Sequence, residues 1–281
     1  MRLSLCNEVL RHMPFPAQCE MAAALGYDGL EIAPFTLDPD PHLLTAMRRA
    51  EVRRAAADAG IAITGLHWLL VTPRDLSLNG PDDDMRFRTI DVMERLVGLC
   101  ADLGGSVLVH GSPHQRGVPE GDDPTAYWDR AVAALSAAAE AAEAAGVTYC
   151  LEPLSRAETN FVNTVAEAAR LVSSVGSPAL RTMIDTSAAG QTEDLSVPDL
   201  IRRWLPTGVV AHVQLNDTNR RGPGQGDDDM PAILQALLDM GYGGVAAVEP
   251  FIYAPDGPTT AARSIGYLRG VLDSLTPSSG P

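Results

Sequence analysis

Val147-Thr-Tyr-Cys-Leu-Glu152 is the first of four stretches in which a short apolar run ends in a polar residue. The other three are Leu180-Arg-Thr-Met-Ile-Asp185, Val209-Val-Ala-His-Val-Gln214 and Gly244-Val-Ala-Ala-Val-Glu249. Successive stretches lie roughly 30 residues apart, which is about the length of one strand and the helix that follows it. In a barrel of parallel strands, the carboxyl ends of all strands meet at one mouth, so these four polar side chains are predicted to converge there.

The whole chain alternates short β-like runs with longer stretches of helical period. Strands are predicted at 2–6, 28–33, 61–67, 106–110, 147–152, 180–185, 209–215 and 244–249. Helices are predicted at 16–25, 42–59, 83–103, 125–145, 164–175, 197–204, 229–240 and 258–275. Eight repeated strand-helix units predict an α/β fold, a single-domain (β/α)8 TIM barrel over residues 1–275. The Ser- and Pro-containing tail at 276–281 is expected to be frayed.

Composition and charge narrow the classes of function. The chain has 281 residues, 46% of them hydrophobic, which is enough to bury a full core. Its formal net charge of -15, with no basic run longer than an Arg-Arg pair, argues against a nucleic-acid partner. No segment reads as a signal peptide or a membrane span, and the four cysteines lack CxxC spacing. We therefore expect buried thiols, no membrane partner and a cytoplasmic location.

The four convergent polar residues predict a cation site. A buried carboxylate is costly unless it is paired, and three together repel one another, a conflict that a divalent cation removes. The alternative is that each acid caps the following helix or pairs with a nearby arginine. Oxygen donors without imidazole favour Mn²⁺, Mg²⁺ or Co²⁺ over zinc. Gln214 is the weakest member of the set, because a neutral amide could instead hydrogen-bond a ligand.

Four motifs resemble the xylose isomerase-like superfamily of TIM-barrel sugar isomerases and epimerases. Leu151-Glu152-Pro-Leu-Ser-Arg-Ala-Glu158 is similar to the fifth-strand motif of the tagatose/psicose 3-epimerases, and Met183-Ile-Asp185-Thr to their sixth-strand motif. His212-Val-Gln214 with its following loop, and Val248-Glu249-Pro-Phe251, are similar to the seventh- and eighth-strand motifs. The resemblance covers most of the chain and is most marked from 147 to 251.

The resemblance assigns roles to particular residues. It implies one divalent metal ion held by Glu152, Asp185, Gln214 and Glu249. It implies that Glu152 and Glu249 are also the catalytic acid and base, and that Glu158 and Arg220 contact the sugar. For Arg220, a surface charge paired with Asp217 is the alternative.

Two positions depart from the 3-epimerase pattern. Gln214 stands where those enzymes have a histidine ligand, which is similar to the His-x-Gln pattern of hydroxypyruvate isomerases, and Ala188 stands where many relatives have a substrate-binding histidine. A contact missing at Ala188 could come from His67, His110 or His114.

Three histidines are predicted to bind substrate. His67 and His110 end the third and fourth predicted strands, and His212 shares the inward parity of Gln214. For each of the three, a hydrogen bond to another site residue is the open alternative. Glu8 and Glu31, at the ends of the first two strands, are open between lining the pocket and capping.

The expected activity is a metal-dependent isomerisation or epimerisation of a small sugar or hydroxy-keto compound through an enediolate. One alternative is a metal-dependent dehydratase of the inosose or dehydroshikimate type on the same scaffold. Another is a non-catalytic sugar-binding barrel, which the alanine at position 188 keeps open. The resemblance also implies a homodimer or homotetramer.

Overall fold

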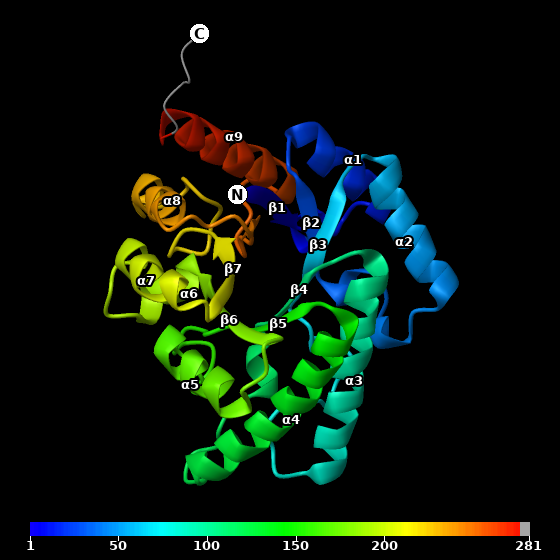
Figure 1. Cartoon of the computed structure of the whole chain (residues 1–281). Helices are drawn as coiled ribbons and strands as arrows, with labels where there is room; N and C mark the ends of the chain where they lie inside the picture. Colours follow the sequence, from blue (N-terminus) through cyan, green and yellow to red (C-terminus); the bar gives the residue numbers. More distant parts are fainter. Residues whose placement is uncertain (276–281) are drawn as a thin grey trace.

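The computed structural model describes residues 1–275, and its centre is a closed barrel of eight parallel strands (Figure 1). Each strand pairs with the next one in the sequence, and the last strand pairs with the first. The strands are β1 (Arg2–Cys6), β2 (Gly29–Ile32), β3 (Ala62–His67), β4 (Val107–His110), β5 (Thr148–Leu151), β6 (Leu180–Asp185), β7 (Val210–Leu215) and β8 (Val245–Val248). The eight predicted strands and the predicted closure are therefore confirmed.

The helices form a ring outside the barrel (Figure 1). They are α1 (Phe15–Leu25), α2 (Ala46–Asp58), α3 (Asp83–Leu103), α4 (Pro124–Ala145), α5 (Val165–Val175), α6 (Thr186–Thr192), α7 (Val197–Trp204), α8 (Met230–Asp239) and α9 (Gly257–Leu275). All eight predicted helices are present, and α6 is an addition that the sequence pattern did not predict. The predicted frayed tail lies outside the described residues.

Local signals fix where the helices begin and end. Asp82 and Thr164 accept hydrogen bonds from the first turns of α3 and α5, and α5 has a complete capping box. Gly104 and Gly146 end α3 and α4 with positive φ angles of 87° and 69°, a conformation that costs glycine little. Each helix therefore returns the chain to the start of the next strand.

The strands alternate between two environments, as the two-residue repeat of a strand requires. Residues such as Leu5, Leu30 and Leu108 pack in the large apolar layer between barrel and helices. Val107, Val109, Cys150 and Met183 form a second, small cluster on the inner face of β4, β5 and β6. Above this interior cluster, toward the carboxyl ends of the strands, the inward positions are polar. No helix within residues 1–275 is long and apolar enough to span a membrane.

Candidate active site

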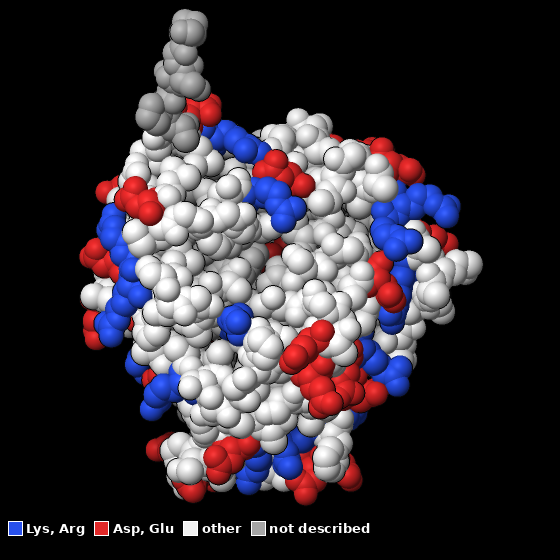
Figure 2. All heavy atoms as spheres, viewed as in Figure 1, with Lys and Arg blue, Asp and Glu red and all other residues white. Residues whose placement is uncertain are grey.

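Three acidic side chains meet at the carboxyl ends of β5, β6 and β8. Glu152, Asp185 and Glu249 are at most 5% exposed, and one carboxylate oxygen from each lies within 4.8 Å of the others. The parity of each strand turns these residues inward, because Cys150 and Met183, two positions earlier, lie on the inner face of the barrel. A hollow at the centre of the face in Figure 2 exposes acidic atoms at its floor.

Burial dominates the electrostatics of this acidic cluster. Burial, reinforced by the charges of Glu249 and Asp185, raises the pKa of Glu152 well above its usual value. Burial also raises the pKa of Asp185 to about 6 and that of Glu249 to about 8. Carboxyls in such surroundings resist ionisation unless a cation joins them, and all the donor atoms are hard oxygens. The residues therefore fit a hard divalent cation.

Asp185 is held by both of its oxygens. Oδ1 accepts a hydrogen bond from the backbone N–H of Ala188 at 2.6 Å, which caps α6. Oδ2 accepts a hydrogen bond from Nδ2 of Asn216 at 3.0 Å. The same Nδ2 donates to the backbone carbonyl of Glu249 at 2.8 Å, so that one buried amide links the ends of β6, β7 and β8. Capping and cation binding are thus compatible roles for Asp185.

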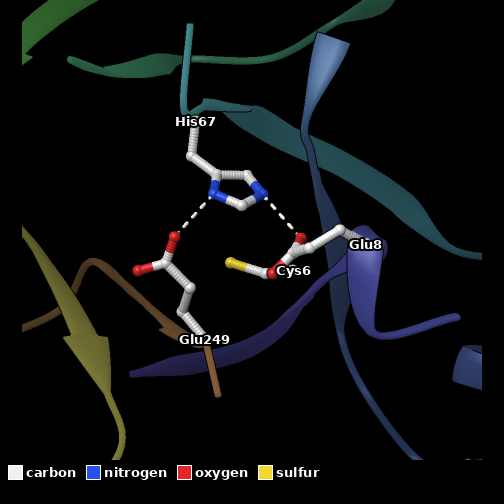
Figure 3. Close-up of side chains that lie close together, drawn as sticks. All are labelled: Cys6, Glu8, His67 and Glu249. Carbon is white, nitrogen blue, oxygen red and sulfur yellow. Dashed lines mark hydrogen bonds and ion pairs between the residues drawn. The ribbon is translucent and has the colours of Figure 1, made fainter. Parts of the chain in front are cut away.

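Glu249 is backed by a buried histidine, as Figure 3 shows. Nδ1 of His67 lies 2.8 Å from Oε1 of Glu249, and Nε2 lies 2.9 Å from Oε2 of Glu8. Burial lowers the pKa of His67, but the charge of Glu8 and the bond to Glu249 outweigh it, and the pKa is raised well above its usual value. The Sγ of Cys6 lies beside these three side chains, Glu8, His67 and Glu249. His67 therefore fixes one carboxylate oxygen of Glu249.

Gln214 is paired in strand register with Asp185 and is fully buried. Its Nε2 donates a hydrogen bond to Oε1 of Glu31 at 3.0 Å, and its Oε1 has no hydrogen-bond partner within residues 1–275. The other oxygen of Glu31 lies 2.8 Å from Nε2 of His212. Burial raises the pKa of Glu31, but the ion pair with His212 outweighs this and the pKa is lowered.

A cavity of about 310 Å³ opens above the acidic cluster. Its lining is made of Trp68, Gly111, Pro113, His114, Glu152, Leu154, Ala157, Glu158, Arg220, Glu249 and Phe251. Arg220 and Glu158 face each other at 3.9 Å. The guanidinium of Arg220 also stacks 4.8 Å from the centre of the Phe251 ring. The cavity thus combines carboxylates, one accessible guanidinium and aromatic walls, a composition suited to a polyhydroxylated small molecule.

The sequence-predicted residues fall into three groups. Glu152, Glu158, Arg220 and Glu249 line the cavity, and Asp185 lines a small separate pocket that shares Glu152 and Glu158 with it. His67 and His212 are buried beneath it, paired with Glu8 and Glu31. His110 shares the outward parity of Leu108, and its Nδ1 lies 2.8 Å from the hydroxyl of Tyr149. The substrate roles of these three histidines stay predictions, and the geometry brings none of them into the cavity lining.

Sequence reasoning missed several groups around the cavity. Trp68 and Phe251 form part of its wall, with ring centres 6.0 Å apart, and each follows a predicted strand end directly or by two residues. Arg116 is fully buried, and none of its three side-chain nitrogens has a hydrogen-bond partner in the described part of the chain. Burial lowers the pKa of Arg116 to about 10, against the opposing charge of Glu152. Aromatic residues at strand ends were a usable signal, whereas nothing local marked Arg116.

The fold and the cluster define a class: a TIM barrel with an oxygen-rich, cation-compatible site at the carboxyl ends of its strands. The family model described as xylose isomerase-like TIM barrel matches residues 19–271. The chain belongs to the xylose isomerase-like TIM barrel family.

Particular relatives sharpen this assignment. The chain is similar to a D-psicose 3-epimerase of Ruminiclostridium cellulolyticum, with 32% identity over 238 residues, 83% of this chain and 77% of the relative. A 3-dehydroshikimate dehydratase of Pseudomonas putida is 30% identical over 92% of this chain, but only 39% of the relative is covered. A solved D-psicose 3-epimerase with D-tagatose from Clostridium cellulolyticum H10 superposes with a TM-score of 0.83. That structure is 24% identical and covers 97% of this chain and 99% of its own, so it confirms the barrel fold.

Proposed function

We propose that this protein is a divalent-metal-dependent epimerase or isomerase of a small ketose. The observation that carries the proposal is the buried cluster of Glu152, Asp185 and Glu249, open to a cavity of about 310 Å³. The similarity to curated ketose 3-epimerases, among them the D-psicose 3-epimerase of R. cellulolyticum, supports a ketose as substrate.

Glu152, Asp185, Glu249 and the amide oxygen of Gln214 would hold the metal ion. When bound, a divalent cation would acidify the C–H next to the substrate carbonyl and favour the enediolate. Glu152 and Glu249 come from strands three apart around the barrel and reach the same cavity. One of them would remove the proton from one side of the sugar, and the other would return a proton to the opposite side.

The remaining cavity groups would hold the sugar. Arg220 and Glu158 offer a guanidinium and a carboxylate at 3.9 Å from each other, which suits hydroxyl groups on neighbouring carbons. Trp68 and Phe251 present apolar faces that would exclude water from the reacting carbons.

Proton exchange with solvent tests this proposal. Purified protein loaded with Mn²⁺, Mg²⁺ or Co²⁺ is incubated with D-psicose, D-fructose and D-tagatose in D2O, and deuterium at the carbon next to the carbonyl is measured by NMR. We expect incorporation together with an epimeric or isomeric product. Glu152→Gln and Glu249→Gln should each lower the rate by about 10²- to 10⁴-fold. Glu140→Gln, an exposed position on α4, is the matched control and should leave the rate unchanged.

A dehydratase is the second candidate, because of the similarity to the P. putida enzyme. Product mass separates the two reactions: loss of water would favour the dehydratase, whereas retained mass with deuterium uptake supports the epimerase. Absence of exchange with every ketose and hydroxy acid tried, in protein that binds the cation, would contradict both and favour a non-catalytic sugar-binding barrel.

A further inference from the structure

The amide of Gln214 has a fixed orientation in the barrel interior. Its nitrogen faces Glu31 on β2 at 3.0 Å, and its oxygen is buried without a partner among residues 1–275. The strand register pairs Gln214 with Asp185, so the two side chains start from neighbouring inward positions. The free amide oxygen is therefore the end that lies away from Glu31.

Glu31 allows the amide of Gln214 only one orientation. A carboxylate accepts hydrogen bonds and donates none, so it can satisfy the NH2 end of an amide but would repel the oxygen end. The second oxygen of Glu31 lies 2.8 Å from Nε2 of His212, so turning Glu31 away would break this buried ion pair. Both Glu31 and His212 are at most 1% exposed, so no bulk water competes for these contacts.

We propose that Glu31, clamped by His212, is the positioning residue that turns the amide oxygen of Gln214 toward the metal. The inference rests on the proposed function, because it gives Gln214 a role in the same metal site. Glu31 itself acts only through Gln214, and it touches neither the metal nor the substrate. The arrangement explains how a glutamine can serve as a ligand at this position with a single donor orientation.

An exchange of the two side chains tests the inference. In Glu31→Gln, the new amide accepts from His212 and so turns its NH2 toward Gln214, which draws the oxygen of Gln214 to position 31 and away from the metal. In Gln214→Glu, two carboxylates abut and repel each other. In the double variant, the amide at position 31 accepts from His212 and donates to the carboxylate at position 214, which leaves one oxygen free again. The pattern of bonds is restored with donor and acceptor reversed.

Mn²⁺ affinity of the metal-depleted proteins is measured by isothermal titration calorimetry, and the visible absorption of the Co²⁺ forms reports the coordination. We expect each single variant to bind Mn²⁺ about 10- to 100-fold more weakly than wild type, and the double variant to regain affinity to within a few-fold. The Co²⁺ spectrum should change in the single variants and return toward that of the wild type in the double variant.

Several outcomes would overturn the inference. Wild-type affinity in Glu31→Gln would do so, and so would a double variant that binds no better than the weaker single variant. Melting of the metal-free proteins reports folding separately, since a merely structural role would lower the melting temperature without a reciprocal rescue of affinity. If Glu31→Gln does not fold, the comparison of Gln214→Glu with the double variant still decides the question.

Failure of the proposed metal site has a different signature. Asp185→Asn removes a carboxylate that the inference does not involve. If wild type and Asp185→Asn bind Mn²⁺ equally, or neither binds it, the metal site is wrong. If Asp185→Asn weakens binding and the exchange at positions 31 and 214 has no effect, only the role of Glu31 is wrong.

Discussion

Gly111 follows β4 directly and leaves the space in which the carboxylate of Glu152 lies. A Cβ added at Gly111 would overlap Oε2 of Glu152, the movable end of that side chain. The glycine therefore leaves room for the carboxylate of Glu152 at the mouth of the barrel. A larger residue at position 111 would therefore clash with the side chain of Glu152 rather than with the backbone.

Gly111→Ala should consequently damage the site more than the fold. We expect the carboxylate of Glu152 to be displaced, with Mn²⁺ affinity lowered at least 10-fold and deuterium exchange lowered about 100-fold. The melting temperature of the metal-free protein should change by only a few degrees. Calorimetry, the exchange assay and thermal melting measure the three quantities. Gly243→Ala is the control, because a Cβ there meets nothing within 4 Å.

A large fall in melting temperature with normal metal affinity in Gly111→Ala would contradict this reading. It would mean that the backbone gives way instead of the carboxylate.

At the scale of single residues, strand parity decided what the sequence could predict. Glu152, Asp185 and Glu249 end inward-facing runs, and the structure brings them together as predicted. His110 ends a run too, but its parity is that of Leu108, and it packs toward Tyr149 in the layer outside the barrel. The sequence predicted where each strand ends. It did not predict which side chains of a four-residue strand point into the barrel, because that depends on the register with the neighbouring strands.

Pairings between distant strands were also beyond the sequence. Glu8 and Glu31 were open between capping and lining the pocket, and the structure instead pairs them with His67 and His212 below the cavity. Nothing local in the sequence indicates which histidine meets which acid, because these contacts form only when the barrel closes.

At the scale of elements, the loop between β7 and α8 positions Arg220. Its φ angle is 67°, in the left-handed region that non-glycine residues rarely adopt. The backbone carbonyl of Arg220 accepts hydrogen bonds from the N–H groups of Phe251 and Ile252 at 2.9 and 3.0 Å. The loop after β7 is thereby tied to the segment after β8, and the guanidinium is held over the Phe251 ring. The strained backbone conformation of Arg220 thus occurs at a residue that lines the cavity.

Two substitutions at Arg220 separate strain from binding. Arg220→Ala and Arg220→Gly both remove the guanidinium, so both should raise KM for the ketose about equally, by roughly 10-fold or more. Only glycine relaxes the left-handed backbone, so Arg220→Gly should be more stable than Arg220→Ala by about 1 kcal/mol. Steady-state kinetics and chemical denaturation measure the two effects. Different KM values for the two variants would show that backbone geometry, not the guanidinium, controls binding.

Helix α6 shows why one element escaped the sequence pattern. Thr186–Thr192 has seven residues, too few to show a helical period, and it contains a glycine. It forms because Asp185 caps its first turn while also belonging to the acidic cluster. The sequence left capping and metal binding open as alternatives for Asp185, and in the structure its carboxylate both caps α6 and belongs to the acidic cluster.

At the scale of the whole molecule, repetition made the fold predictable. Eight similar units of strand and helix, each closed by short turn signals, leave a parallel barrel as the simplest arrangement that buries every strand. The same closure carries buried acids from five strand ends into one interior. Among residues 1–275, the buried acids Glu8, Glu31, Glu152, Asp185 and Glu249 have two histidines, His67 and His212, paired with members of the group. An excess of buried negative charge should make metal-free stability sensitive to pH.

The direction of that pH dependence follows from the shifted groups. Burial raises the pKa of Asp185 to about 6 and of Glu249 to about 8, so the folded chain holds these protons more tightly than the unfolded chain. Such a group favours folding at low pH, and the benefit is lost as the pH rises through the folded pKa. His67, whose pKa is also raised, acts in the same direction. Glu31, whose pKa is lowered, loses its contribution only below about pH 4.5.

We therefore expect the melting temperature in EDTA to fall by several degrees between pH 6 and pH 8, and Mn²⁺ to offset most of the loss. A cation at 100 times its dissociation constant stabilises the folded state by about 2.7 kcal/mol, and the gain should be larger at pH 8, where fewer protons compete with the metal. Differential scanning fluorimetry at three pH values, with and without Mn²⁺, measures both effects. Glu249→Gln removes the group with the pKa of about 8 and should flatten the EDTA curve. A melting temperature that is constant or rises from pH 6 to pH 8 in EDTA would show that the buried charges are already neutralised without a metal.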